Sequence, residues 1–150
     1  MKPVIFIRIA SVLLFLHAVL HTVGGVFGKV NAGPATVAVT AMKTNQFMAM
    51  GNMRTFWDFY IGMALGVTIS LTVESVALWF LAPLAASHGE KLRPALAAFA
   101  IGYLVFSVNS FRYFFLAPVI TEILIAACLG LAIATAKSPS EPSQRTAARA

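Results

Sequence analysis

Residues 56–81 of the chain read FWDFYIGMALGVTISLTVESVALWFL, an apolar run with two acids and no basic residue. A helix needs roughly 20 mostly apolar residues to cross a bilayer core about 30 Å thick, and this run is long enough. Three further runs of the same kind lie at residues 4–26, 96–115 and 118–136. We therefore predict an all-α, polytopic membrane protein that folds as an up-down bundle of four transmembrane helices.

The composition agrees with a membrane protein rather than a water-soluble one. Hydrophobic residues make up 59% of the chain and charged residues 11%, whereas about a quarter of the residues of a soluble domain are charged. The apolar runs are continuous and do not alternate in units of about ten residues, which excludes the strands of an outer-membrane barrel. We expect one transmembrane domain over residues 1–136, followed by a disordered cytoplasmic tail at 137–150 that is rich in Ser, Pro, Arg and Ala.

The 11 lysines and arginines are scattered at the ends of the predicted helices, so the net charge of +6 does not indicate a nucleic-acid partner. With the N-terminus in the cytoplasm, seven of them fall on the cytoplasmic side and four on the outer side. The positive-inside rule therefore favours cytoplasmic termini. A cleaved signal peptide ending near residue 32 is the less favoured alternative. The first apolar run is longer than the usual span of about 7–15 residues and contains two histidines.

The connection between the first two predicted helices, residues 30–53, is the longest in the domain. Three glycines within residues 24–28 end the first helix, and Pro34 suits the first turn of a short helix that follows. We expect this short helix to lie along the outer membrane interface as a lid. Trp57 and Tyr60, at the start of the next helix, have the positions of an interfacial aromatic belt.

Polar and ionisable side chains inside the apolar runs are the main lead on function. A charge in hydrocarbon costs on the order of 3 kcal/mol or more unless it is paired. At a rise of about 1.5 Å per residue, six such side chains fall in the outer leaflet, beneath the expected lid. These candidate ligand-binding residues are His17, His21, Asp58, Asn109, Arg112 and Glu122. Glu74 lies nearer the inner end of its helix and is a second, separate polar position.

His17 and His21 are four residues apart and share one helix face. Such a pair suits three roles that the sequence leaves open: a hydrogen-bond network between helices, contact with a ligand or a proton, and half of a metal site. Arg112 and Glu122 are expected to form an ion pair, because the short turn between their helices brings them to a similar depth.

Five methionines lie in one region of the sequence: Met42, Met48, Met50, Met53 and Met63. Thioethers are soft ligands that suit Cu(I). Methionine is more often a flexible gap-filler in an apolar environment, so we assign no metal and no cofactor from the sequence.

Three segments carry a resemblance to known proteins: HAVLHTVGG at residues 17–25, RTFWDFYIG at 54–62 and NSFRYFF at 109–115. Through them the chain resembles a family of small bacterial four-helix integral membrane proteins to which no activity is assigned. Its layout is also similar to that of DoxX-type bundles and of the sterol-isomerase and sigma-2-receptor group, whose four-helix core holds acids and histidine in a membrane pocket. The resemblance implies the four-helix topology, a location in the inner (cytoplasmic) membrane of a bacterium and, by analogy, an amphiphile-binding cavity.

These features predict a small membrane protein that binds a lipid-like or quinone-like amphiphile at the outer polar cluster, or that serves as an accessory membrane subunit. One alternative is an intramembrane acid–base enzyme, an isomerase or hydrolase, that acts on a lipid. Another is a purely structural polar network without a ligand. The expected partners are the bilayer, the amphiphile and a second copy of the chain or a membrane complex. The sequence contains no phosphate-binding loop, nucleophile elbow or nucleotide fingerprint.

Overall fold

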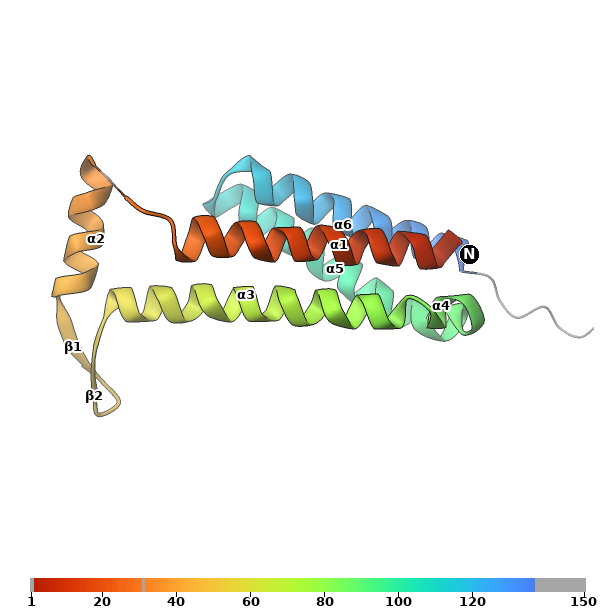
Figure 1. Ribbon diagram of the computed structural model, residues 1–150, viewed down its shortest axis with the longest axis horizontal. Helices are drawn as coiled ribbons and strands as arrows, with labels where there is room; N and C mark the ends of the chain where they lie inside the picture. The colour runs from red at the N-terminus through yellow and green to blue at the C-terminus, as the bar shows by residue number, and fades with distance from the viewer. Residues whose placement is uncertain (1, 31, 137–150) are drawn as a thin grey trace, which may run out of the picture. The chain divides into compact units, whose positions relative to one another are not determined.

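The computed structural model describes residues 2–30 and 32–136, and it is mostly helical. Within these residues, four helices are long and apolar enough to cross a membrane (Figure 1). They are α1 (Lys2–His21) with its extension η1 (Thr22–Val26), α3 (Phe56–Leu81), α5 (Gly89–Tyr113) and α6 (Leu116–Thr135). The four long apolar helices are therefore confirmed, and their arrangement as a transmembrane bundle stays a prediction.

The third long helix, α5, begins at Gly89, ahead of the apolar run at 96–115. The segment before that run forms the one-turn helix α4 (Leu84–Ser87) and the first turns of α5. Hydropathy marks only the part of a helix that suits hydrocarbon, whereas the helical backbone continues into polar residues such as Glu90.

The chain divides into two compact units. Unit 1 comprises Met1–Leu13 and Ser75–Ala150, and unit 2 comprises Leu14–Glu74. The boundaries fall inside α1 and α3, so each of these helices contributes residues to both units. The single domain expected over residues 1–136 stays a prediction, and the tail expected to be disordered, 137–150, lies outside the described residues.

Unit 1 contains the helix pair α5 and α6, which pack against each other along their lengths. Leu96 of α5 and Leu129 of α6 are fully buried. Ser11 in α1 and Ser75 in α3 are also buried, and each donates its hydroxyl to the backbone carbonyl of the other, at 2.8 and 2.9 Å. Such reciprocal bonds between helices hold them together where the apolar surroundings offer few competing partners.

Unit 2 contains the connection between α1 and α3. The helix α2 (Pro34–Thr44) has Pro34 in its first turn, as predicted, and none of its residues is fully buried. An antiparallel hairpin then leads into α3, with strands β1 (Gln46–Ala49) and β2 (Asn52–Thr55) (Figure 1).

The sequence did not predict this hairpin. Its two-residue turn, Met50 and Gly51, has positive φ angles of 48° and 86°. Such angles are typical of the type I′ turn, which usually carries Asn-Gly or Asp-Gly, and Met50 gives no such signal. The ring of Phe47 packs against Phe56 and Phe59 of α3, with centroids 4.7 and 5.8 Å apart, and so anchors the hairpin.

Candidate functional site

The candidate residues divide between the two units. Unit 2 contains His17, His21, Asp58 and Glu74, and unit 1 contains Asn109, Arg112 and Glu122. The single outer-leaflet cluster of six side chains therefore stays a prediction.

Thr68 in α3 makes hydrogen bonds, through its hydroxyl, to two residues at the end of the first helix. Its hydroxyl oxygen lies 3.1 Å from Nδ1 of His21 and 3.0 Å from the hydroxyl oxygen of Thr22. Thr22 donates its own hydroxyl to the carbonyl oxygen of Ala18, at 2.7 Å. Each hydroxyl has one proton to donate, so Thr68 donates to Thr22 and Nδ1 of His21 donates to Thr68. This chain of hydrogen bonds joins the end of α1 to α3.

The π-helical turn η1 follows directly on His21 and contains Gly24 and Gly25. Turns of this kind widen a helix and are frequent at functional sites. The His21 ring lies beside Gly25, because a Cβ atom built there would stand 3.5 Å from Nε2. With Nδ1 directed at Thr68, Nε2 is the ring nitrogen that faces the turn.

His17 lies one helical turn before His21 and is partly buried. Its Nδ1 atom is shielded from solvent and has no hydrogen-bond partner within the described part of the chain. Leaving a buried polar group without a partner is unfavourable by roughly 1–3 kcal/mol. In unit 2, His17 is therefore well placed to accept a further partner.

Asp58 has a local structural role. Its carboxylate accepts a hydrogen bond from the backbone N–H of Thr55 at 2.8 Å, and the Thr55 hydroxyl accepts one from the backbone N–H of Asp58 at 3.1 Å. This reciprocal pair is a capping box at the start of α3. The Thr-x-x-Asp pattern is visible in the sequence, and it accounts for this exposed acid without a ligand.

Glu122 is buried in unit 1, with 5% of its surface exposed. One carboxyl oxygen accepts a hydrogen bond from the hydroxyl of Ser110 at 2.9 Å, and the other, Oε2, has no partner among the described residues. Arg112 is exposed, with its guanidinium 5.7 Å from the centroid of the Tyr113 ring. The expected ion pair of Arg112 and Glu122 is not found among the described contacts, in which Ser110, on the buried face of α5, donates to the Glu122 carboxylate instead. Asn109 is exposed as well.

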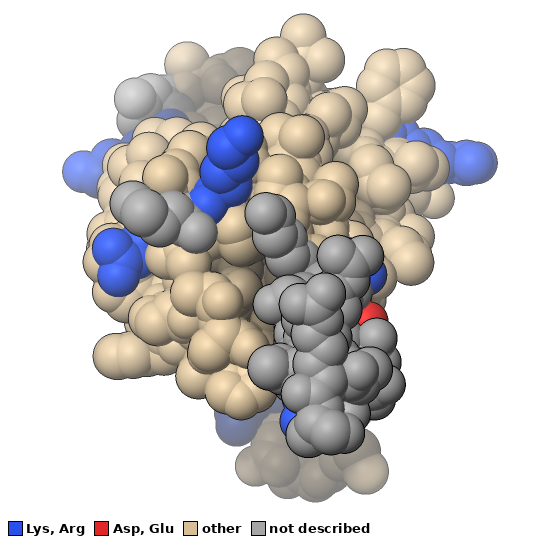
Figure 2. Space-filling view, turned by 90° about the vertical axis from the view of Figure 1, so that its right-hand side faces the viewer, with Lys and Arg blue, Asp and Glu red and all other residues tan. Residues whose placement is uncertain are grey.

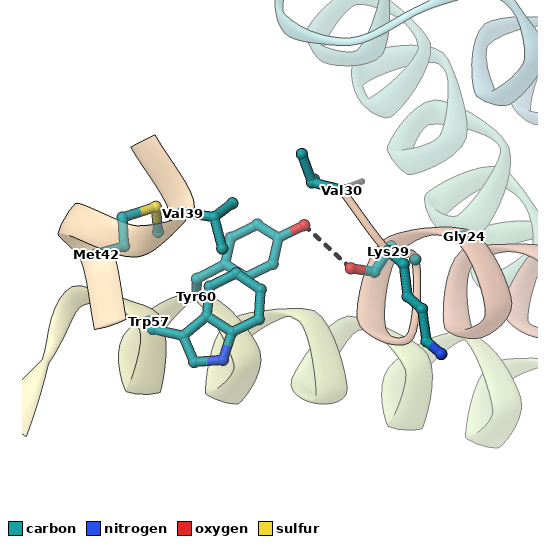
Figure 3. Close-up of a pocket in the computed structure, with 9 residues that line it drawn as sticks. Gly24, Lys29, Val30, Val39, Met42, Trp57 and Tyr60 are labelled. Atoms are coloured by element: carbon teal, nitrogen blue, oxygen red, sulfur yellow. Dashed lines mark hydrogen bonds between the residues drawn. The ribbon is translucent and has the colours of Figure 1, made fainter. Parts of the chain in front are cut away.

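A pocket of about 310 Å³ lies in unit 2, between the end of α1, α2 and the start of α3 (Figure 3). Glycines of the first helix end, apolar side chains of the connection and two aromatic rings line it: Gly24, Gly25, Gly28, Lys29, Val30, Val39, Met42, Trp57 and Tyr60. None of the six candidate residues is in this lining.

Two aromatic rings form one wall of the pocket. Trp57 and Tyr60 are stacked with their ring centroids 5.2 Å apart. The ammonium of Lys43 lies 4.4 Å from the Trp57 ring centroid, and the Tyr60 hydroxyl donates to the carbonyl oxygen of Gly25 at 3.0 Å. These contacts hold both rings in place. The Lys29 ammonium is directed away from the two rings (Figure 3).

The glycines of the pocket differ in the space around them. A Cβ atom at Gly28 would collide with the carbonyl oxygen of Gly24, so a larger residue at 28 requires the backbone to shift. A Cβ atom at Gly24 would meet no atom within 4 Å. Gly24 therefore leaves its backbone open to close approach by a ligand.

Sequence reasoning recognised these glycines as a helix end and the two aromatic residues as an interfacial belt, but it did not join them into one pocket. The pocket forms only because the connection between α1 and α3 folds so that Val39 and Met42 of α2 lie at the same cavity. Thr68 was also missed, although a threonine inside an apolar run is a signal for hydrogen bonding between helices.

Comparison of the chain with protein-family models, with curated proteins and with solved structures finds no match. The resemblance to small bacterial four-helix membrane proteins therefore stays an expectation from the sequence. The case for a binding site in unit 2 depends on the geometry of the pocket.

Proposed function

We propose that this chain is a multi-pass protein of the bacterial inner membrane that binds a lipid-like or quinone-like amphiphile in the pocket beneath α2. The observation that carries this proposal is the pocket itself. Its volume of about 310 Å³ lies at the lower end of the range of roughly 300–1,000 Å³ that small-molecule sites occupy. A mostly apolar lining with few polar groups is also what an amphiphile requires.

Membrane insertion is supported by the apolar side chains that the long helices leave uncovered. At most 33% of the apolar window of any of these helices is buried. Large side chains such as Leu20, Phe80 and Phe111 are exposed. Large apolar side chains exposed in such numbers promote aggregation in water, whereas a bilayer covers them with lipid.

The proposed orientation has both termini in the cytoplasm. Figure 2 is viewed from the side at which Figure 1 labels the N-terminus and α4, and basic side chains are visible on this face. Lys91 and Arg93 belong to the first turns of α5 at this end. A basic rim of this kind suits the cytoplasmic face of a membrane.

The lining of the pocket favours a neutral, flat head group. Among the described residues of the lining, Lys29 is the one charged side chain, and its ammonium is directed away from the aromatic pair (Figure 3). Trp57 and Tyr60 offer planar apolar surface, and the Tyr60 oxygen retains a lone pair that can accept a hydrogen bond. A quinone-like or phenol-like ring meets these conditions, with its apolar tail against Val39 and Met42.

The helix α2 suits the role of a lid. Val39 and Met42 are partly buried and line the pocket, yet no residue of α2 is fully buried. Few buried contacts hold this helix in place, so local opening requires little free energy. The hydrogen-bonded chain of His21, Thr68 and Thr22 supports the opposite wall, which accounts for polar residues near the pocket that do not line it.

Native mass spectrometry of the full chain, released gently from detergent, tests this proposal. We expect the wild-type protein to retain a small amphiphile. Gly24→Leu places a side chain in the open space at the pocket and is expected to abolish retention. Gly62→Leu is the matched control, because Gly62 has equally open surroundings on α3 but lies outside the pocket. A bare wild-type mass, or equal retention by Gly24→Leu, would contradict the proposal.

A further inference from the structure

The β1–β2 hairpin brings three methionines together. Its register places Met48 directly opposite Met53. Directly opposite residues of antiparallel strands have Cβ atoms about 4.5–5.5 Å apart, and their side chains point to the same face. Met50 occupies the adjoining turn, two residues beyond Met48. Three long, flexible thioether side chains therefore emerge close to one another at the tip of the hairpin.

Packing does not account for these methionines. Met48 is 64% exposed, Met53 is 50% exposed and Met50 is fully exposed. Side chains alternate between the two faces of a strand, so Phe47 lies on the opposite face, where it contacts the phenylalanine rings of α3. One face of the hairpin thus packs against α3 through Phe47, and the other face exposes the thioether side chains of Met48 and Met53.

We propose that Met48, Met50 and Met53 form a binding site for Cu(I). Thioether sulfur is a soft ligand that suits Cu(I) better than it suits harder divalent ions. Two of the three proposed ligands already face each other across the strands. None of the three lines the amphiphile pocket, and the two proposals are therefore independent.

The ligand chemistry also distinguishes this site from a histidine or cysteine site. Histidine and cysteine must lose a proton before they bind a metal, whereas a thioether has no proton to lose. We therefore expect an affinity that stays constant between about pH 5 and pH 8. Within the described residues, no group of three or more His, Cys, Asp or Glu side chains is placed to hold a metal ion.

Isothermal titration of the detergent-purified full chain with Ag(I), a redox-stable probe for Cu(I), tests the site. A Cys128→Ala background removes the free thiol, which would itself bind silver. We expect one Ag(I) per chain, displaced by Cu(I) under reducing conditions. The double variant Met48→Ile, Met53→Ile keeps residues that suit strands, and its affinity is expected to fall by about tenfold or more. Met63→Ile on α3, where Met63 is 66% exposed, is the matched control and is expected to bind as the background protein does.

A second measurement needs no hairpin variant and decides the matter if the double variant does not fold. Peroxide converts exposed methionine to the sulfoxide, and a bound metal protects its thioether ligands. We expect Ag(I) to protect Met48, Met50 and Met53 but not Met63. Absence of saturable binding, equal affinity of the folded double variant, equal protection of Met63, or a marked loss of affinity at about pH 5 would each overturn the proposal.

Discussion

The Nδ1 atom of His21 lies 3.1 Å from the hydroxyl oxygen of Thr68, and this contact joins the last turn of α1 to the middle of α3. The same threonine oxygen lies 3.0 Å from that of Thr22, at the start of the π-helical turn. Thr68 therefore fixes the position at which the helix widens toward the pocket. Thr68 is expected to stabilise this part of the structure through hydrogen bonds, because its side chain contributes little apolar area.

Thr68→Val tests this role by replacing the hydroxyl with a methyl group of similar size. His21 and Thr22 then lose a shared partner, and we expect the free energy of unfolding to fall by about 1 kcal/mol. Thr72→Val is the matched control, because the Thr72 hydroxyl bonds only to a carbonyl of its own helix. Thermal unfolding in detergent measures both variants. Equal melting temperatures for the two would contradict the role assigned to Thr68.

The two glycines Gly24 and Gly28 are expected to respond in opposite ways to alanine. Gly28→Ala puts a Cβ atom against the carbonyl oxygen of Gly24, so the backbone must shift and stability is expected to fall. Gly24→Ala meets open space, and its effect is expected to lie between neutral and a gain of up to about 1 kcal/mol from helix propensity. Thermal unfolding in detergent checks both, and a Gly24→Ala variant that loses as much stability as Gly28→Ala would refute this reading of the turn.

The buried pair of Ser110 and Glu122 predicts strong non-additivity in unit 1. Ser110→Ala leaves both carboxyl oxygens of a buried acid without a partner, and we expect a loss of about 1–3 kcal/mol. In the double variant Ser110→Ala, Glu122→Leu, the acid is replaced by an apolar side chain of similar size, and much of this stability is expected to return. A double-mutant cycle measures the coupling. Additive effects of the two substitutions would show that the hydrogen bond contributes nothing.

Asp58 is expected to affect stability but not ligand binding. Asp58→Ala removes the capping box at the start of α3 and is expected to lower the free energy of unfolding by about 1 kcal/mol. The folded variant is expected to retain the same amphiphile as the wild type, because Asp58 does not line the pocket. Melting temperature and native mass spectrometry of one preparation give both results. Loss of the amphiphile from the stably folded variant would show that Asp58 contributes to ligand binding and would contradict its purely structural role.

Much of the fold was predictable because long apolar runs have few alternatives. The run at 56–81 became α3 with the same bounds, and Pro34 marked the start of α2. The hairpin escaped prediction, since its turn has Met50 where a type I′ turn usually has Asn or Asp. Its strands are also too short for an alternating pattern to be distinctive.

The candidate site was less predictable than the fold. The polarity of a side chain and its expected depth in the membrane do not determine its hydrogen-bond partner. Glu122 was expected to pair with Arg112, but its carboxyl bonds to Ser110, a hydroxyl that is one of several in these apolar runs and that the sequence does not single out. The exposed acid Asp58 caps a helix. The pocket walls were missed because glycine and tryptophan have ordinary roles at a helix end and at a membrane interface, and only the fold brings Trp57 to Gly24.

The most direct test of the central claim is a fluorescence titration of Trp57 with a short-chain quinone. The variant Trp79→Phe leaves Trp57 as the sole tryptophan and lies outside the pocket. We predict saturable quenching in this background, and its loss when Gly24→Leu is added but not when Gly62→Leu is added. Quenching that does not saturate, or that Gly24→Leu leaves unchanged, would contradict the account of this pocket as the binding site.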